Sequence, residues 1–271
     1  GLVDLKLSEE KEEPISHVKI EKEQLSEHNK LRYQIHLKSA MICKSAQGNQ
    51  ADTQDYIAGS KVLGLLVGAL GEEKYRESMK QGEGIRVTNA YITNHGKRSI
   101  PRRISLQKEK DQSYDKNGEM KVYDMLYEKD IRKEIKDRQM SPVSVDYVDE
   151  NGTVSGVTTE ISYHHQRPRD KSIGRATGKV DGSSFYQLCS ISADQNFSGY
   201  IYADRKQAEM ILDAVENLGN VRMGYGRSSE FGAVDFVIDG VEKESIEPEI
   251  VHRAVLTLAS DVILYNENGA L

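Results

Sequence analysis

Alternating hydrophobic and polar residues mark the first strand that the sequence predicts. Between residues 31 and 41, apolar side chains occupy every second position as far as residue 37 and recur at residue 41. A period of two places the two kinds of side chain on opposite faces of a strand, so one face is expected to be buried. The apolar set is Leu31, Tyr33, Ile35, Leu37 and Met41, and the polar set is Arg32, Gln34, His36 and Lys38.

Shorter apolar runs predict the remaining strands. They fall at residues 85–92, 143–148, 154–161, 185–191, 197–202, 234–238, 251–258 and 262–265. The runs at 143–148 and 154–161 flank Asp149-Glu150-Asn151-Gly152. This tetrapeptide is typical of a hairpin turn, because Asn-Gly pairs adopt the positive φ angles that such turns require.

Apolar residues at helical spacing predict two helices. One covers residues 60–70 with Ser60 as its N-cap. The other begins after the N-cap Asp204 and ends at Gly219 in a left-handed conformation. Gly64, Gly68 and Gly71 share one face of the first helix, which indicates either close packing against that face or a loosely held helix.

The order of these elements predicts an α+β fold, built from one or two ferredoxin-like or RRM-like modules with a large insertion. A short helix is expected near residues 128–138 of that insertion, and the end of the chain is expected to be truncated, as in a piece of a longer polypeptide. The expected organisation is an acidic flexible arm at 1–29, the first part of the core at 30–95, a charged insertion at 96–140, the remainder of the core at 141–250 and the start of a further strand pair at 251–271.

Composition narrows the class of protein. Of the 271 residues, 30% are charged and 37% are hydrophobic, so the chain can bury a core. The longest apolar stretch, residues 62–70, is far shorter than the ~20 residues of a membrane-spanning helix, and no membrane association is expected. Cys43 and Cys189 cannot form a disulfide framework or a zinc site by themselves. We therefore expect a reducing, cytoplasmic location, with no metal and no cofactor.

Charge is distributed unevenly along the chain. The formal net charge is −6, which taken alone points away from nucleic acid. Residues 1–29 have four lysines and eight carboxylates, residues 235–249 have one lysine and six carboxylates, and the rest of the chain has a net charge of +3. Basic clusters lie at residues 97–103 and 163–179. Because salt screens exposed charges beyond roughly 10 Å, a local basic groove is compatible with a negative net charge of the whole chain. The acidic segments are expected to face solvent or basic partners.

Residues 220–232 form a glycine-rich loop between the second helix and a strand. Glycines let backbone N–H groups approach a phosphate closely, Arg222 and Arg227 add positive charge, and Tyr225 or Phe231 could stack on a base. The loop is equally explained as a connection that needs positive φ angles. It is neither a Walker loop nor a dinucleotide-binding fingerprint, since no Gly-Lys-Ser/Thr follows and the loop precedes a strand.

Three segments resemble the RAMP superfamily of CRISPR repeat-associated proteins. The glycine-rich loop resembles the C-terminal glycine-rich loop of that superfamily. Residues 55–64 resemble the Tyr-Ile-Pro-Gly-Ser segment that opens the first helix of type III effector subunits, although Ala58 replaces the proline and Leu63 stands where a basic residue is common. Residues 163–176, followed by Phe185-Tyr186 and Phe197-Ser198-Gly199, resemble the type III-D subunit at the 5′-handle end of the crRNA.

The resemblance implies a crRNA-binding subunit of a type III CRISPR effector complex in antiviral defence. Its implied partners are crRNA, other RAMP subunits, a large polymerase-like subunit and target RNA. The residues expected to contact RNA are Gly59, Ser60, Lys61, Arg98, Arg102, Arg103, His164, His165, Arg167, Arg169, Arg175, Arg222, Gly224, Tyr225, Gly226, Arg227, Ser228, Ser229 and Gly232.

Two other functions stay open at this point. One is a RAMP endoribonuclease acting on crRNA precursor or target RNA. Cleavage without a metal would need a general base and acid, for which His36, His164 and His165 are the candidates. The resemblance implies a second route, in which an Asp in the loop after the first strand cleaves target RNA with the help of a metal, and Asp52 is the candidate there. His164 and His165 are adjacent on a predicted strand, so they are expected to point to opposite faces and not to serve one site. The other alternative is a protein–protein interaction module whose glycine-rich loop is purely structural.

Overall fold

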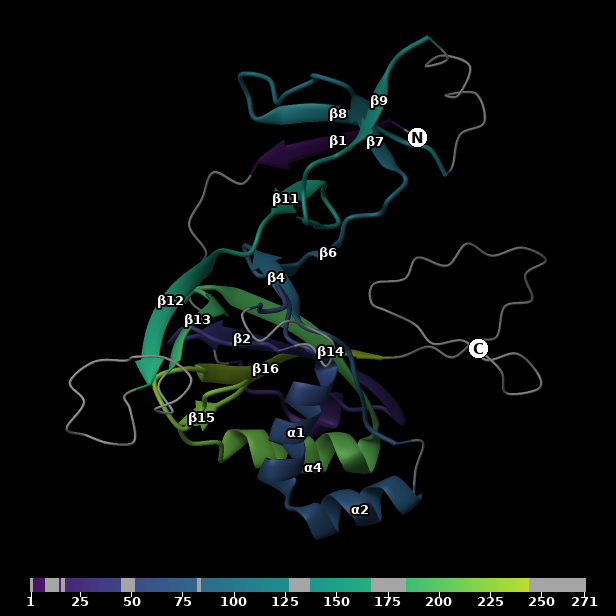
Figure 1. The fold of residues 1–271 in the computed structure, drawn as a ribbon. Helices are drawn as coiled ribbons and strands as arrows, with labels where there is room; N and C mark the ends of the chain where they lie inside the picture. Colours follow the sequence, from purple (N-terminus) through teal and green to yellow (C-terminus); the bar gives the residue numbers. More distant parts are fainter. Residues whose placement is uncertain are drawn as a thin grey trace, which may run out of the picture. The chain divides into compact units, whose positions relative to one another are not determined.

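The computed structural model describes residues 2–7, 15, 18–44, 52–81, 84–126, 137–166 and 184–243, and these divide into two compact units (Figure 1). One contains the described residues within Gly1–Glu13 and Tyr91–Gly156, and we call it the strand-rich unit. The other contains those within Pro14–Ala90 and Val157–Lys243. This grouping differs from the sequence-based ranges, because the N-terminal strand belongs with residues 91–156.

The second unit is organised around β2 (His28–Leu37). β14 (Asn196–Asp204) pairs with one edge of β2 and β16 (Ala233–Lys243) with the other, both antiparallel. β3 (Arg86–Val87) pairs with the far side of β14, and β15 (Val221–Arg222) pairs with the start of β16. Helices link β2 to β3 and β14 to β16, which is the split βαβ order of a ferredoxin-like unit. The predicted α+β class is confirmed, and we call this part the ferredoxin-like unit.

Helices α1 (Gly59–Leu70), α2 (Glu72–Gln81) and α4 (Arg205–Glu216) lie on one side of this sheet (Figure 1). The predicted alternation of β2 is confirmed, since its four apolar side chains at residues 31–37 are fully buried. Tyr33 stacks on Phe236 with ring centroids 5.5 Å apart, and its hydroxyl donates to the Thr88 carbonyl oxygen at 2.8 Å. From the helices, Val62, Leu66, Ala208 and Ile211 complete the core.

The predicted start of α4 is confirmed and its predicted end is wrong. Asp204 accepts a hydrogen bond from the Gln207 backbone N–H, and the Gln207 side chain accepts one from the Asp204 N–H, a complete capping box. The helix ends at Glu216 with Asn217 as its C-cap. Gly219 has no positive φ, because the chain has already left the helix before reaching it.

The start of α1 differs from the prediction. The helix begins at Gly59, with Ala58 at the N-cap, so Ser60 lies inside the first turn and is not the cap. The Gly59 N–H donates instead to the Asn89 side-chain oxygen at 2.9 Å. Close packing on the face of Gly64 and Gly68 is also wrong, since a Cβ at either position would meet no heavy atom within 4 Å.

Helix α2 was not predicted by the apolar pattern. Its sequence is strongly polar and begins with two glutamates, which suit a helix N-terminus. Gly71, with a φ of 85°, separates it from α1. The predicted strand at 85–92 is observed as two short strands, β3 and β4 (Tyr91–Asn94).

In the strand-rich unit, two segments that were expected to be irregular form a sheet. Residues 2–7 were expected in a flexible arm and form β1 (Leu2–Leu7), and the expected insertion at 96–140 supplies several strands. The order is β6 (Ile100–Pro101), β10 (Tyr147–Val148), β11 (Thr153–Ser155), β1, β8 (Glu119–Asp124), β7 (Leu106–Glu109) and β9 (Met140–Pro142), with β4 and β5 (Lys97–Arg98) forming a hairpin.

Pairing with β8 and β11 explains why β1 is ordered. Leu5 is fully buried in a cluster with residues of β7, β8 and β11. The predicted turn at Asp149–Gly152 is confirmed between β10 and β11, although the strands are shorter than expected. The helix predicted near 128–138 falls mostly on residues outside the described ranges, and the strands predicted at 251–265 fall wholly outside them.

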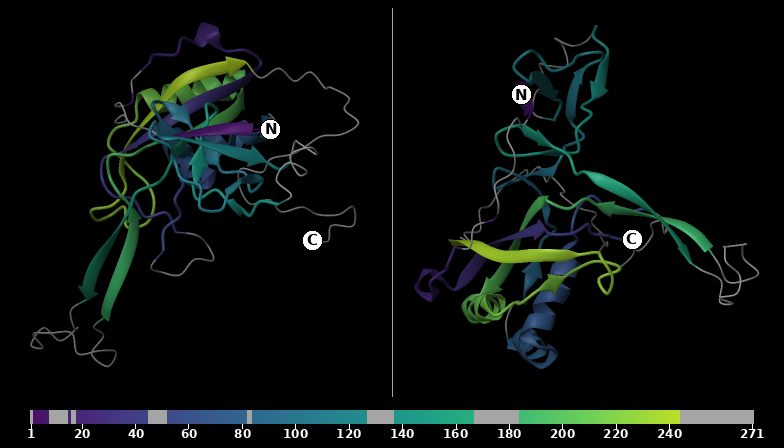
Figure 2. Two further views of the ribbon diagram at one scale, coloured as in Figure 1. Left: turned by 90° about the horizontal axis from the view of Figure 1, so that it is seen from above. Right: turned by 90° about the vertical axis from the view of Figure 1, so that its left-hand side faces the viewer.

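A separate two-stranded ribbon, β12 (Thr159–Gln166) with β13 (Ser184–Ile191), extends away from the ferredoxin-like sheet (Figure 2). The segment predicted as one strand at 154–161 is thus divided between β11 and β12. In the described part of the chain, no helix is both long and apolar enough to cross a membrane.

The two kinds of glycine in α1 should respond oppositely to alanine. A Cβ at Gly59 would overlap the carbonyl oxygen of Val87, so Gly59→Ala should lower the free energy of unfolding by roughly 1–3 kcal/mol. Gly64 lies on an exposed, open face, so Gly64→Ala should raise it by about 0.5–1 kcal/mol. Urea unfolding followed by circular dichroism measures both changes, and equal effects would contradict the packing described for Gly59.

Candidate nucleic-acid interface

Residues 41–44, directly after β2, connect three segments that are distant in the sequence. Met41 exchanges two backbone hydrogen bonds with Ile191, at 2.9 and 2.8 Å, which joins the end of β13 to this segment. Ile42 accepts a hydrogen bond from the backbone N–H of Tyr225, at 2.9 Å, which joins the glycine-rich loop. The Lys61 side chain donates to the carbonyl oxygen of residue 44 at 3.3 Å, which joins the start of α1. We call residues 41–44 the junction segment.

The glycine-rich loop has the backbone conformation that its sequence predicts. Gly224, Gly226 and Gly232 all have positive φ angles. A Cβ at Gly224 would lie 2.7 Å from the carbonyl oxygen of Ile42, and one at Gly232 would overlap that of Met223. The glycines are therefore required by the fold whether or not a ligand binds, because they let the loop approach the junction segment.

The loop side chains divide into internal supports and exposed groups. Arg222 donates from one guanidinium nitrogen to the carbonyl oxygens of Ser229 and Phe231, both at 2.9 Å, so it holds the loop closed. Phe231 is only 6% exposed and is not available to stack on a base. Tyr225 is 52% exposed, and Arg227 also lies on the surface.

A lysine from the junction segment adds charge to the exposed side of the loop. The Lys44 ammonium lies 3.6 Å from the centroid of the Tyr225 ring, a cation–π contact. Lys61 approaches the same residue through its hydrogen bond to the Lys44 carbonyl oxygen. We call Lys44, Lys61, Tyr225 and Arg227 the loop patch. Sequence patterns did not single out Lys44, because its contact with Tyr225 joins positions 181 residues apart.

The β12–β13 ribbon exposes aromatic rings on one face. Tyr163 and Phe185 stack with their centroids 5.9 Å apart and an interplanar angle of 14°, yet they are 66% and 72% exposed. Ile161, 56% exposed, and the exposed His165 share this face through the strand register. Sequence reasoning missed Tyr163 and Phe185 as site residues, although their period-two placement beside His165 was a usable signal.

The opposite face of the ribbon contacts the glycine-rich loop. His164 stacks on Tyr186 at 5.5 Å, and its ring meets that of Phe231 edge-on at 6.4 Å. A ring nitrogen of His164 also lies 2.9 Å from the Ser162 hydroxyl. The prediction that His164 and His165 point to opposite faces is confirmed. Arg167, Arg169 and Arg175 lie outside the described residues, between the two strands.

The predicted basic cluster at 97–103 belongs to the strand-rich unit and makes contacts there. Arg98 lies over the ring of Tyr91, with 4.9 Å between its guanidinium carbon and the centroid. Arg102 donates to the Val145 carbonyl oxygen at 3.0 Å, and Arg103 pairs at 3.1 Å with Asp124, whose side chain is almost fully buried. These contacts support the local fold. RNA contact at these three arginines stays a prediction.

The two catalytic candidates have different surroundings. The Nδ1 atom of His36 lies 2.8 Å from the side-chain oxygen of Asn196, and its Nε2 atom lies 3.9 Å from a carboxylate oxygen of Asp194. Asp52 is exposed and lies just before Thr53, whose hydroxyl accepts a hydrogen bond from the Cys43 N–H. Within the described ranges, no group of three or more His, Cys, Asp or Glu side chains is arranged to hold a metal ion.

Arg222 and Arg227 should differ in their effect on stability. Arg222→Ala removes two hydrogen bonds that close the loop, so the free energy of unfolding should fall by about 1–2 kcal/mol. Arg227→Ala changes an exposed side chain and should leave it unchanged within about 0.5 kcal/mol. Chemical denaturation of both variants measures the difference. A destabilised Arg227→Ala with an unaffected Arg222→Ala would contradict the assignment.

The two cysteines should report whether the junction segment stays closed. Burial raises the pKa of the Cys43 thiol to about 12, with the Lys61 charge acting in the opposite direction, whereas Cys189 is partly exposed. Only the thiolate reacts, so at about pH 8 a thiol reagent should modify Cys189 rapidly and Cys43 only as the protein opens. Colorimetric thiol titration, with and without denaturant, measures this. Equal native rates would mean that residues 41–44 are not packed as described.

Comparison with known proteins gives structural neighbours only. No family model matches the chain, and no curated protein matches it. A chain of the type III-B Cmr-beta complex in its apo state is similar with a TM-score of 0.42 and 11% identity, covering 77% of this chain and 96% of that one. A chain of Cmr-beta bound to cognate target RNA is similar with a TM-score of 0.41 and 12% identity, covering 79% of this chain and 62% of that one.

Proposed function

We propose that this chain is a crRNA-binding RAMP subunit of a type III CRISPR effector complex. The observation that carries the proposal is that the three sequence segments resembling that family are joined in the ferredoxin-like unit. The helix-opening segment and the glycine-rich loop both contact the junction segment, through Lys61 and Tyr225. The histidine-containing segment contacts the loop through His164 and Phe231. A single RNA-binding surface would explain why one chain contains all three motifs.

The ribbon supports RNA binding through its exposed rings. Tyr163 and Phe185 are too exposed to contribute to a core, and an isolated two-stranded ribbon has only marginal stability. Single-stranded RNA presents unstacked bases, which aromatic side chains bind through their π faces. The stacked pair would therefore hold one or two bases, with His165 beside them on the same face.

The loop patch supports contact with the phosphate backbone. Lys44 brings positive charge to the Tyr225 ring, which can stack on a base, Lys61 is hydrogen-bonded to the Lys44 carbonyl oxygen, and Arg227 adds an exposed positive charge two residues from Tyr225. This cluster does not conflict with the net charge of −6, because local charge determines binding at physiological salt. Arg167, Arg169 and Arg175 would extend the contacts from the segment between the ribbon strands.

The proposed partners follow the resemblance. They are crRNA, other RAMP subunits, a large polymerase-like subunit and target RNA, and the sequence resemblance to the type III-D subunit suggests a position at the 5′-handle end. We propose a binding role and not a nuclease, because His36 is hydrogen-bonded to Asn196 in the sheet while Asp52 lies in a loop after the junction segment.

RNA binding can be tested by fluorescence anisotropy with single-stranded RNA at several salt concentrations. Tyr163→Ala and Phe185→Ala should each weaken binding by roughly 5- to 150-fold, since stacking on a base contributes about 1–3 kcal/mol. Ile104→Ala is the control, because Ile104 is an apolar residue in the strand-rich unit that is even more exposed, at 83%. Tight RNA binding that neither Tyr163→Ala nor Phe185→Ala weakens would contradict the proposed interface.

The phosphate contacts can be tested separately through the salt dependence of RNA binding. Lys44→Ala and Arg227→Ala should each reduce the slope of log K against log salt by about 0.7, whereas Lys74→Ala, on the exposed surface of α2, should not. An absence of RNA binding at low salt would favour the protein–protein module instead. Denaturing gels of the same samples, with and without Mg²⁺, test the endoribonuclease alternative, which requires cleavage that His36→Ala or Asp52→Ala abolishes.

A further inference from the structure

A groove of about 610 Å³ lies in the ferredoxin-like unit on elements that the proposed RNA interface does not use. Its walls are residues 18–23, the second half of α4 and one part of β16. The apolar lining comes from Leu212 and Val215 of α4, from Leu218 just after that helix and from Phe236, Val237 and Ile238 of β16, with Val18 and Ile20 facing them.

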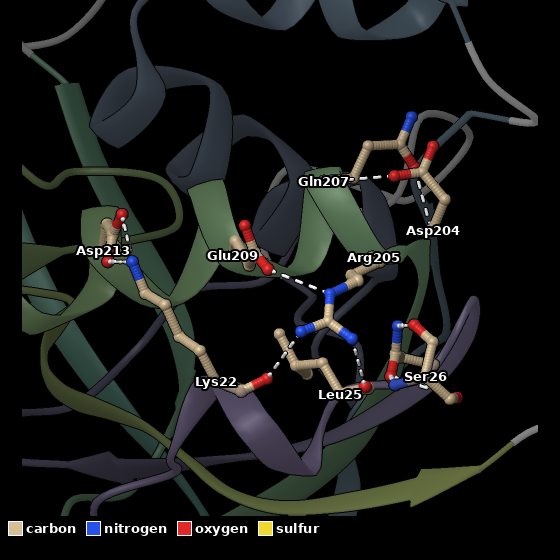
Figure 3. A network of polar contacts seen from close by, with 9 residues as sticks. Lys22, Leu25, Ser26, Asp204, Arg205, Gln207, Glu209 and Asp213 are labelled. Carbon is tan, nitrogen blue, oxygen red and sulfur yellow. Dashed lines mark hydrogen bonds and ion pairs between the residues drawn. The ribbon is translucent and has the colours of Figure 1, made fainter.

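Residues 18–25, which we call the strap, are fixed along α4 at two points (Figure 3). The Arg205 guanidinium donates to the carbonyl oxygens of Leu25 and Lys22, at 3.0 and 3.4 Å. Further along the helix, the Lys22 ammonium pairs with Asp213 at 2.7 Å, and this hydrogen bond raises the pKa of Lys22. Because both contacts are made within this chain, the strap and the groove behind it are already formed before any partner binds.

Among the described residues, no strand pairs with the outer edge of the part of β16 that lines the groove, although Phe236, Val237 and Ile238 are only 7%, 4% and 6% exposed. Lys38 donates its backbone N–H to the carbonyl oxygen of Ala233, so the peptide groups of Ala233 face β2. Successive residues of an antiparallel strand direct these groups to opposite edges, so those of Phe236 and Ile238 face away from β2. Among the described residues, β15 pairs with that side of β16 only at Ala233 and Val234.

We propose that this edge is a docking site for an extended segment of a partner polypeptide, which adds a strand to β16 at Phe236–Ile238. A strand is the ligand that satisfies the outward N–H and C=O groups of both residues, and exposed edges commonly recruit one. Alternate side chains of the added strand would pack on the apolar floor beside Leu212 and Val215.

Charge defines the partner further. Four carboxylates line the groove, from Glu21, Glu23, Asp213 and Glu216, against the ammonium groups of Lys19 and Lys22. A segment that alternates basic and apolar residues complements this surface, whereas RNA would bring its phosphates against carboxylates. The site is therefore independent of the proposed RNA interface.

The proposal can be tested on the full chain with a peptide of alternating lysine and valine, and with its glutamate–valine counterpart. The lysine peptide should bind, and residue-resolved hydrogen exchange should show that it protects the amides of Phe236 and Ile238. Ile238→Pro removes one outward N–H while leaving the β2 pairing intact, so it should weaken binding about five- to tenfold. Ile238→Val, which keeps that N–H, is the matched control.

A second variant tests the charge without altering the backbone. The double substitution Glu23→Lys and Glu216→Lys, at two exposed positions, should weaken the lysine peptide and strengthen the glutamate peptide. Three results would overturn the proposal. The first is protection of both amides in the free chain, which would mean that its own residues occupy the edge. The second is self-association of the chain that Ile238→Pro abolishes. The third is peptide binding that none of the substitutions changes. RNA binding should be unchanged in Ile238→Pro and Ile238→Val, which do not alter the charge, so this site and the RNA interface can fail separately.

Discussion

The backbone pairing of Met41 and Ile42 is the constraint on which the candidate interface depends. Both residues are essentially fully buried, so their N–H and C=O groups must find partners within the protein. Those partners are Ile191, at the end of the ribbon, and Tyr225, in the glycine-rich loop. Leaving a buried peptide group unpaired costs about 1–3 kcal/mol, so the fold cannot easily release either segment. The interface is thus assembled by backbone hydrogen bonds, and its side chains are free to specify a ligand.

Two local sequence signals predicted the local structure correctly. The period-two pattern of β2 and the capping box at Asp204 each depend on residues within a few positions of one another, and both are observed. The start of α1 was misjudged because its first N–H is satisfied by Asn89, 30 residues away. The strand at Leu2–Leu7 was missed because it also depends on distant residues. It lies next to a run of acidic residues that predicts a flexible arm, and it forms a strand by pairing with β8 and β11.

The candidate site shows the same division between local and distant information. The glycines of the loop could be found in the sequence, because positive φ angles restrict the residue type. The separate roles of Arg222 and Arg227 could not, since only the folded loop shows which of them reaches the carbonyl oxygens of Ser229 and Phe231. Lys44 was overlooked because its value depends on the Tyr225 ring, which the junction segment brings to it.

The described part of the acidic segment, residues 235–243, has a different role from the one its composition indicated. It was expected to face solvent or basic partners, yet three carboxylates of β16 pair with basic residues on or just after β2: Glu242 with Lys30, Asp239 with Arg32 and Asp235 with Lys38. These pairs lie across the two strands, so the charges of β2 that would attract RNA to that face are largely neutralised. Within this sheet, the basic groups that we propose for RNA are those of the loop patch, near the start of β16, while the strap and α4 keep their carboxylates along its outer edge. The cross-strand ion pairs therefore lie between the proposed RNA interface and the proposed docking site for a basic polypeptide.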